Sequence, residues 1–362
     1  MSMLGASNSA DASQSLDSSG AAAATHVTNN NVTLLQDRIK PATLIKVGYG
    51  DGIHGNNSIP PRFVVGYWSM RGLGAPVRMM LSAAHAHNKA RGGGNGVPHW
   101  VALYDVVEEH DATDEGWSFK SWIYDKEWMM SDCNPFMNLP YLIDVKEQYV
   151  LTQSNAILSY LGRELGMMGS TKLEMAKCDE LLSTIYDLRD TMVHFAYYGT
   201  PTAEECWATA QKHFQNLETH LSRQMREYST VVDAVNDDVT VVPNYFLMGT
   251  TTTAPDFPLY EMLDQYEMLA KQHGFASIDT KYPILAKYKS TMEELPEHQD
   301  YLNSFLHQGL PLNNPYARFA SSLSAMSYER GQETPWRNLG IVVLDSNVVK
   351  KRPPPEEESC RR

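Results

Sequence analysis

A short apolar run that passes through a glycine-containing turn into an amphipathic helix is the feature that most constrains the fold. The run Phe63–Tyr67 contains adjacent valines and predicts a strand. Pro76 stands near the start of the helix, where its missing N–H costs little. The helix is predicted from apolar residues at intervals of three and four, namely Val77, Met80, Leu81 and Ala84. This unit indicates an α/β fold, in which ligands collect where strands end, and the strand ends on a phenol.

The segment that follows completes a first domain. Residues 101–106 predict a strand, and residues 107–138 read as a long loop that is acidic at first and then rich in tryptophan. Tyr141–Asp144 and Tyr149–Thr152 predict a β-hairpin. A helix is expected from Ser154, with an apolar stripe formed by Ala156, Ile157, Tyr160 and Leu161. The order β-α-β-loop-β-β-α is the thioredoxin-like one.

Long helices dominate after Gly169. Apolar residues recur at alternating intervals of four and three from Leu181 to Phe195 and from Trp207 to Tyr228, and a later helix opens at Pro283. The predicted fold class is therefore a thioredoxin-like α/β domain followed by an all-helical domain. We expect a disordered extension over residues 1–61, the thioredoxin-like domain over 62–168, the all-helical domain over 169–321 and a largely disordered tail over 322–362.

Whole-chain properties exclude several classes of partner. The chain has 362 residues and a net charge of −13, which argues against a nucleic-acid partner. No apolar run approaches the roughly 20 residues that span a bilayer, so no membrane partner is expected. The four cysteines form neither a CxxC pair nor a metal-ligand cluster, which predicts a reducing compartment and no metal. We expect a cytoplasmic protein, although the Ser- and Ala-rich N-terminus leaves a transit peptide open.

No nucleotide cofactor is expected either. The glycine-rich stretch at residues 91–98 follows a predicted helix and precedes a predicted strand. A phosphate-binding loop has the opposite order, because it follows a strand and opens a helix. The stretch is therefore interpreted as a surface loop.

Three blocks of sequence together resemble the glutathione S-transferase family, most closely its mu class. They are Gly66-Tyr67-Trp68 with Arg71-Gly72-Leu73, then Asn138-Leu139-Pro140-Tyr141-Leu142, and finally Thr152-Gln153-Ser154-Asn155. The resemblance extends over about residues 62 to 320. It implies a transferase with glutathione as co-substrate and hydrophobic electrophilic small molecules as the second substrate, in a detoxification role.

Tyr67 is the catalytic residue that this resemblance implies. The family's tyrosine donates a hydrogen bond to the sulfur of glutathione, and such a bond favours the thiolate, which is the nucleophile. A phenol with a pKa near 10 stays protonated and can donate. The alternative is Ser69, because some classes of transferase use a serine, although it stands two residues beyond the matched position.

The same resemblance implies most of the glutathione-binding residues. In the family the bond before Pro140 is cis, and the backbone of Leu139 pairs with the cysteine of glutathione as an added strand does. A helix N-terminus at Ser154 would bind the γ-glutamyl carboxylate. The other first-domain positions assigned to glutathione are Trp68, Leu73, Trp122, Lys126, Asn138 and Gln153.

Lys126 would neutralise the glycyl carboxylate as a point charge. The family has an arginine where this chain has Phe119, a departure that weakens or reroutes the grip on that carboxylate. In the helical domain, Asp187 matches an acid that reaches glutathione across a dimer, and Arg189 is expected in the wall of the substrate pocket. Tyr197 matches a tyrosine that activates electrophiles, with the adjacent Tyr198 as the alternative.

Two further features concern assembly and folding. Phe136 matches an aromatic residue of one subunit that packs into the partner, which predicts a homodimer. Thr253-Ala254-Pro255-Asp256 predicts an N-terminal capping box, with the acid at the third helical position. Two other functions stay open: a sigma-like glutathione-dependent isomerase that uses Tyr67, and a non-catalytic carrier of glutathione or hydrophobic ligands.

Overall fold

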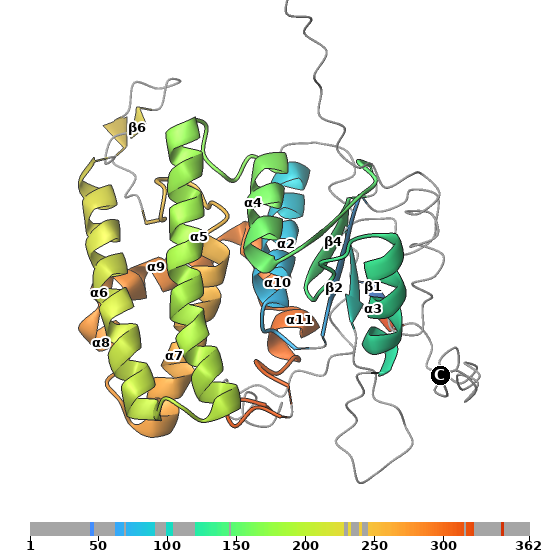
Figure 1. Cartoon of the computed structure of the whole chain (residues 1–362). Helices are drawn as coiled ribbons and strands as arrows, with labels where there is room; N and C mark the ends of the chain where they lie inside the picture. The colour runs from blue at the N-terminus through green and yellow to red at the C-terminus, as the bar shows by residue number, and fades with distance from the viewer. Residues whose placement is uncertain are drawn as a thin grey trace, which may run out of the picture.

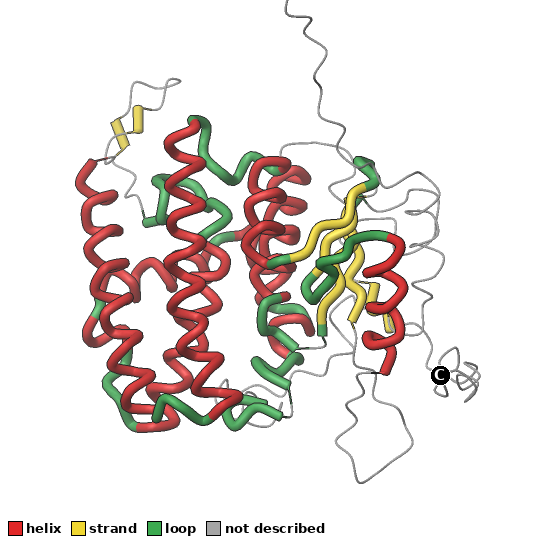
Figure 2. The backbone as a smooth tube through the Cα atoms, in the orientation of Figure 1, coloured by secondary structure: helices red, strands yellow, loops and turns green. Residues whose placement is uncertain are grey.

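The chain is described from a computed structural model, which defines residues 44–46, 62–68, 70–90, 99–103, 120–144, 146–227, 231–232, 239–240, 245–314, 316–321 and 342–343. A sheet with helices on both faces lies beside a bundle of long helices (Figure 1). In Figure 2 the strands gather in one part of the molecule and helices make up the rest. The predicted fold class, a thioredoxin-like domain followed by an all-helical domain, is confirmed.

The sheet of the first domain has the strand order β5-β4-β2-β3-β1-β8. Its centre is β2 (Phe63–Tyr67), which runs parallel to β3 (His99–Leu103) and antiparallel to β4 (Tyr141–Asp144). β4 and β5 (Tyr149–Thr152) form the predicted hairpin. All five residues of β2 are buried, as expected for a strand covered on both faces.

Helices cover both faces of this sheet. α2 (Gly74–Ala90) and α4 (Ser154–Glu164) lie on the face toward the helical domain, and α3 (Lys120–Asp132) lies on the other (Figure 1). The predicted apolar stripe of α2 is buried throughout, but in α4 the predicted stripe is only partly right, because Ala156 is exposed. Ile157 and Leu161 face the core as predicted.

α3 contradicts the loop that was predicted over residues 107–138. Trp122 and Met129 of this helix are buried in one cluster with Val64, Tyr141 and Ile143 of the sheet, a tertiary contact that the local sequence does not reveal. The described order is therefore βαβαββα. The strand predicted over residues 101–106 begins two residues earlier, at His99, and ends at Leu103.

Two short strands extend the sheet beyond the predicted domain limits. β1 (Leu44–Lys46) pairs antiparallel with β3, and β8 (Val342–Val343) pairs antiparallel with β1. These residues belong to the segments 1–61 and 322–362, for which disorder stays a prediction from the sequence. Three-residue and two-residue strands carry too little periodicity to be recognised in a sequence.

The second domain is helical. Its long helices are α5 (Lys172–Val193), α6 (Ala203–Glu227), α7 (Asp256–His273) and α9 (Pro283–Glu294). Shorter elements are the π-helical turn η3 (His194–Tyr198), α8 (Ile278–Lys281), α10 (Pro296–Leu302), α11 (Phe305–Gln308) and the strands β6 (Val231–Val232) and β7 (Val239–Thr240). The predicted stripes on α5 and α6 are buried as far as Met192 and Leu221, and Tyr228 lies outside the described residues.

The two domains share one apolar core. Residues of α2 and α4 belong to the same buried cluster as those of α5, α6 and α7, and α2 packs against both α7 and α10. The interface therefore runs along the face of the sheet domain that carries α2 and α4. A binding site between α2 or α4 and the helices of the second domain would therefore be lined by residues of both domains.

The residues of the predicted capping box bond to one another in the turn before α7, but the acid lies at a different helical position from the one predicted. The Asp256 carboxylate accepts the backbone N–H of Thr253 at 2.7 Å and its hydroxyl at 2.8 Å, and it also accepts the N–H of Leu247 at 3.0 Å. α7 begins at Asp256 itself, so the acid is at the first helical position and not the third.

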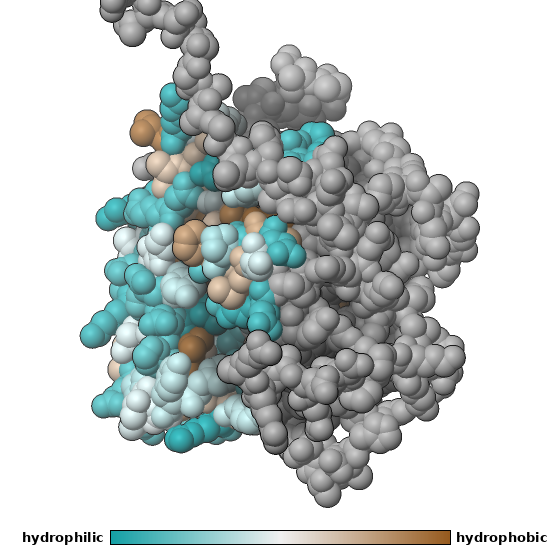
Figure 3. Space-filling view, turned by 45° about the vertical axis from the view of Figure 1, so that its right-hand side comes forward, coloured by the Kyte–Doolittle hydropathy of each residue, from teal (hydrophilic) through white to brown (hydrophobic). Residues whose placement is uncertain are grey.

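No helix within the described parts of the chain is both long and apolar enough to cross a membrane. On the face shown in Figure 3 the described surface is largely hydrophilic, with small apolar areas between polar ones.

Candidate active site between the two domains

Three of the predicted blocks meet at one edge of the sheet. β2 ends at Tyr67, and the pairing of Gly66 with Tyr141 brings the residues before β4 beside that end. The Thr152 hydroxyl donates to the carbonyl oxygens of Asn138 at 2.8 Å and Pro140 at 3.2 Å, which ties this segment to the end of β5. The bond between Leu139 and Pro140 is cis, as the resemblance implies.

The Tyr67 hydroxyl is buried and has a fixed orientation. Its side chain is 4% exposed, and its oxygen accepts the backbone N–H of Leu73 at 3.0 Å. Burial raises the pKa of Tyr67, while Arg189, the Leu73 N–H and Arg78 oppose that rise. The phenol is therefore protonated at neutral pH, and since its oxygen already accepts one hydrogen bond, its own proton is available to donate.

The glycines after β2 allow the tyrosine ring to pack beneath the turn. A Cβ atom on Gly74 would lie 2.5 Å from Cδ1 of Tyr67, and one on Gly72 would lie 2.6 Å from its hydroxyl oxygen. Gly72 also has a φ of 37°, which side-chain-bearing residues rarely adopt. A larger residue at either position would displace Tyr67 or the Leu73 amide.

Arg71 fastens this turn to the helical domain. Its side chain is fully buried, and Nη2 lies 2.6 Å from Glu261 and 2.8 Å from Asp264, both on α7. Its backbone N–H donates to the Pro311 carbonyl at 2.7 Å. Burial lowers the pKa of Arg71, but the two carboxylates outweigh burial and raise it overall, so the guanidinium stays charged.

Arg78 holds the other side of the turn. Its guanidinium donates to the carbonyl oxygens of Met70 at 2.8 Å and Trp68 at 2.9 Å, and it lies 5.7 Å from the centre of the Tyr67 ring. The backbone around the tyrosine is thus fixed by two buried arginines. The sequence analysis did not assign either residue to the site.

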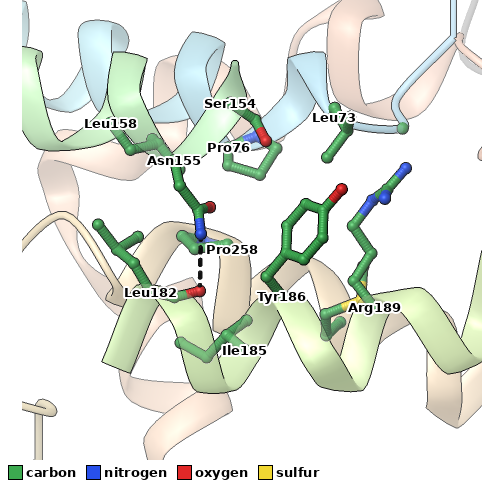
Figure 4. A pocket seen from close by; sticks show the side chains of 12 residues that line it. Leu73, Pro76, Ser154, Asn155, Leu158, Leu182, Ile185, Tyr186, Arg189 and Pro258 are labelled. Carbon is green, nitrogen blue, oxygen red and sulfur yellow. Dashed lines mark hydrogen bonds between the residues drawn. The ribbon is translucent and has the colours of Figure 1, made fainter. Parts of the chain in front are cut away.

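A pocket lies between the two domains beside this turn (Figure 4). The first domain contributes Gly72, Leu73, Pro76, Ser154, Asn155 and Leu158. The helical domain contributes Leu182, Ile185, Tyr186, Arg189, Pro258 and Met262. Of the residues predicted for the site, this pocket brings together Leu73, Ser154 and Arg189.

The start of α4 forms one wall of the pocket. Gln153 precedes the helix with a φ of 74° and a ψ of 115°, a backbone conformation that is rare for a residue other than glycine. Strain of this kind concentrates at functional sites. The buried Ser154, which opens α4 directly after this residue, lines the pocket.

Tyr197 approaches the same region from the helical domain. The π-helical turn η3 interrupts the regular spacing at the end of α5, and the Tyr197 hydroxyl accepts the Asn314 N–H at 3.2 Å and lies 4.0 Å from the Met70 sulfur. Burial raises the pKa of Tyr197 to about 12. Tyr198, the alternative from the sequence, is 66% exposed.

Other predicted residues lie away from the pocket. Trp122 is 6% exposed and stacks on Tyr141 with ring centres 6.3 Å apart, on the opposite face of the sheet, where Trp68 and Leu139 also pack. Lys126 is half-buried, one turn further along α3.

Asp187 and Phe136 face outward within this chain. Asp187 is exposed on α5 and acts electrostatically on His213 of α6, away from Ser154. Phe136 is 77% exposed. Ser69 and Phe119, the serine alternative and the departure from the family pattern, lie outside the described residues.

Several residues that line the pocket were not predicted, although a signal for some of them is present in the sequence. Four of them lie on one face of α5 at the spacing i, i+3, i+4, i+7, namely Leu182, Ile185, Tyr186 and Arg189. Because Arg189 was expected in the pocket wall, this spacing would have predicted the other three. No comparable signal marks Pro258 or Met262, which reach the pocket through tertiary packing. In the described parts of the chain, no cluster of three or more His, Cys, Asp or Glu side chains is arranged to hold a metal.

Comparison with known proteins identifies the family. A family model described as "Glutathione S-transferase, C-terminal domain" matches residues 186–305. The chain is 31% identical over 242 residues to the glutathione S-transferase class-mu 26 kDa isozyme 7 of Fasciola hepatica, which covers 66% of this chain and 88% of that relative. It is 28% identical to isozyme 1 of the same class and organism, over 74% of this chain and 98% of the relative.

The crystal structure of the glutathione S-transferase Blo t 8 has the same fold. It matches with a TM-score of 0.51 at 24% identity, over 71% of this chain and 99% of that one. The chain belongs to the glutathione S-transferase family, and the resemblance seen in its sequence is confirmed.

Proposed function

We propose that this glutathione transferase stabilises the thiolate of bound glutathione with the hydroxyl of Tyr67. The observation that carries the proposal is the bond from the Leu73 N–H to the Tyr67 oxygen, because it leaves the phenol proton free to point at a sulfur. A hydrogen bond to the anion lowers the thiol pKa, so more of the nucleophile is present at neutral pH.

The glutathione peptide would lie along the edge of the sheet where the three blocks meet. The backbone of Leu139 would pair with its cysteine, with Asn138 and Pro140 setting the position of that backbone. The γ-glutamyl carboxylate would bind at the start of α4, at Gln153 and Ser154, where N–H groups and the helix dipole favour an anion. Trp68, Leu73, Trp122 and Lys126 complete the proposed set, with Lys126 near the glycyl carboxylate.

The electrophile would occupy the space bounded by Leu73, Arg189 and Tyr197. Two reaction types suit a thiolate in such a site. In substitution at an activated aromatic ring, the sulfur–carbon bond forms and a halide leaves. In addition to an α,β-unsaturated carbonyl, the sulfur–carbon bond forms and the enolate takes a proton. The Tyr197 hydroxyl could stabilise the developing oxyanion in the second reaction. The biological role would be detoxification of such compounds.

A homodimer is part of the proposal. Phe136 is a large aromatic side chain that a single subunit leaves in water, and aromatic anchors are typical of interface cores. Asp187 would reach the amino group of glutathione in the partner subunit. The domain limits at residues 62, 168 and 321 and a cytoplasmic location belong to the same proposal. The location is supported by the free thiols of Cys178 and Cys206.

The activity is tested by glutathione conjugation to 1-chloro-2,4-dinitrobenzene, followed by absorbance and corrected for the uncatalysed rate. We expect saturable conjugation at neutral pH. A protein that binds glutathione, as calorimetry would show, but conjugates neither this compound nor an unsaturated ketone would be a carrier. Isomerisation of a prostaglandin-type peroxide without loss of glutathione would indicate the isomerase.

A further inference from the structure

Arg189 differs from the other residues around the pocket. Among the described residues that line it, Arg189 is the only one that carries a charge. Figure 4 shows its side chain rising from α5 beside Tyr186, toward Leu73. The guanidinium lies 5.6 Å from the centre of the Tyr186 ring, which stabilises the cation without neutralising it.

The acidic residues nearest in sequence are engaged elsewhere. Asp187 lies near His213 of α6, and Asp190 lies 3.7 Å from His194. Within the described part of the chain no carboxylate lies within ion-pair distance of Arg189. An arginine in a largely apolar pocket is therefore left with donors that a ligand can use.

The charge of Arg189 also reaches the reacting centre. Burial raises the pKa of Tyr67 and of Tyr197, and the positive charge of Arg189 opposes that rise at both hydroxyls. Arg189 lines the pocket together with Leu73, whose N–H donates to the Tyr67 oxygen at 3.0 Å, so an electrophile in this pocket would meet Arg189 close to its reactive carbon.

We propose that Arg189 makes this enzyme selective for electrophiles that carry an anionic group, such as a carboxylate, close to the reactive carbon. The inference rests on the proposed function of the same site. A guanidinium pairs with a carboxylate through two parallel hydrogen bonds, and the apolar surroundings strengthen them. The net charge of −13 repels anions at long range, so a preference for them has to come from a contact inside the pocket.

The test uses an α,β-unsaturated ketone that carries a carboxylate, together with its methyl ester, each corrected for its uncatalysed rate with glutathione. For the wild type we expect kcat/KM to be about tenfold or more higher for the acid than for the ester. Arg189→Gln should abolish this ratio, and Arg189→Lys should retain part of it. The ratio is measured within one enzyme, so a lower folded fraction does not affect it.

Arg163→Gln is the matched control. Arg163 is an exposed arginine that pairs with Asp179 at 3.0 Å outside the pocket, and its loss removes the same unit of charge. It should leave the ratio unchanged. A wild type that conjugates both compounds without preferring the acid would overturn the inference but not the proposed function, as would equal effects of Arg189→Gln and Arg163→Gln. A wild type that conjugates neither compound would refute the proposed function and the inference with it.

Discussion

The buried ion pairs of Arg71 provide the sharpest test of how the active-site turn is held. Arg71 and Glu261 are 0% and 2% exposed, and Asp264 is 17% exposed. Arg71→Met would leave two carboxylates close together without their counter-ion. Removing one partner of a buried pair costs about 3–5 kcal/mol, and that is the loss expected here.

Graded variants follow from the same geometry. Glu261→Gln keeps the size and one acceptor of the side chain, and Asp264 remains 2.8 Å from Arg71, so the expected loss in the free energy of unfolding is about 1–3 kcal/mol. Asp264→Asn should cost less than Glu261→Gln, because Asp264 is partly in water. The free energies are measured by urea denaturation at one protein concentration, since any dimer links stability to concentration.

Arg163→Met is the control for this series. Arg163 and Asp179 are both 46% exposed, and a surface pair of this kind contributes about 0–1 kcal/mol. If Arg71→Met is no more destabilising than Arg163→Met, the buried pair does not fasten the turn to α7, and the account of the turn is wrong.

Three other predictions follow. Tyr197→Phe should lower kcat for addition to an unsaturated ketone about three- to tenfold, the value of one hydrogen bond, while Tyr198→Phe should not; equal effects would reverse the assignment of the two tyrosines. Phe136→Asp should convert a dimer to monomers in sedimentation experiments, and a dimer that survives this change would exclude Phe136 from the interface. Burial raises the pKa of Asp256 from 3.8 to about 6, so the folded state keeps a proton that the unfolded state releases. The Asp256 contribution to unfolding free energy should therefore fall by an amount on the order of 3 kcal/mol as pH rises from 4 to 6, and the stability difference from Asp256→Asn should change only in that range. A difference that is constant from pH 4 to 7 would contradict the raised pKa.

The parts of the fold that were predicted are those in which local pattern and burial agree. Phe63–Tyr67 and the hairpin were predicted to the residue, because each strand is a compact apolar run bounded by turn residues. α3 was missed because its buried Trp122 and Met129 pack on a face of the sheet that the local sequence does not reveal. The formation of α3 depends on tertiary contacts, and so does that of β1 and β8, which pair with distant parts of the chain.

The residues of the candidate site also fall into those that the sequence predicts and those that only the folded structure reveals. The residues at the ends of strands and helices, Tyr67, Leu139 and Ser154, carry motifs that the sequence displays. Arg71 could not be assigned, because its partners Glu261 and Asp264 are 190 and 193 positions away in the chain and only the packing of α2 on α7 brings them together. The geometry of the π-helical turn η3 was equally hidden, although it is what directs Tyr197 inward and Tyr198 outward.

The ionisation of bound glutathione tests the central claim most directly. The thiolate absorbs in the near ultraviolet, so its titration can be followed on the wild-type complex and on Tyr67→Phe at saturating glutathione. We predict that the thiol titrates well below the ordinary value of about 8.5 in the wild type. We predict a pKa about 1–2 units higher in Tyr67→Phe, the amount that one hydrogen bond to an anion supplies. If the thiol titrates at the same pH in both proteins, Tyr67 does not stabilise the thiolate, and that role belongs to another group.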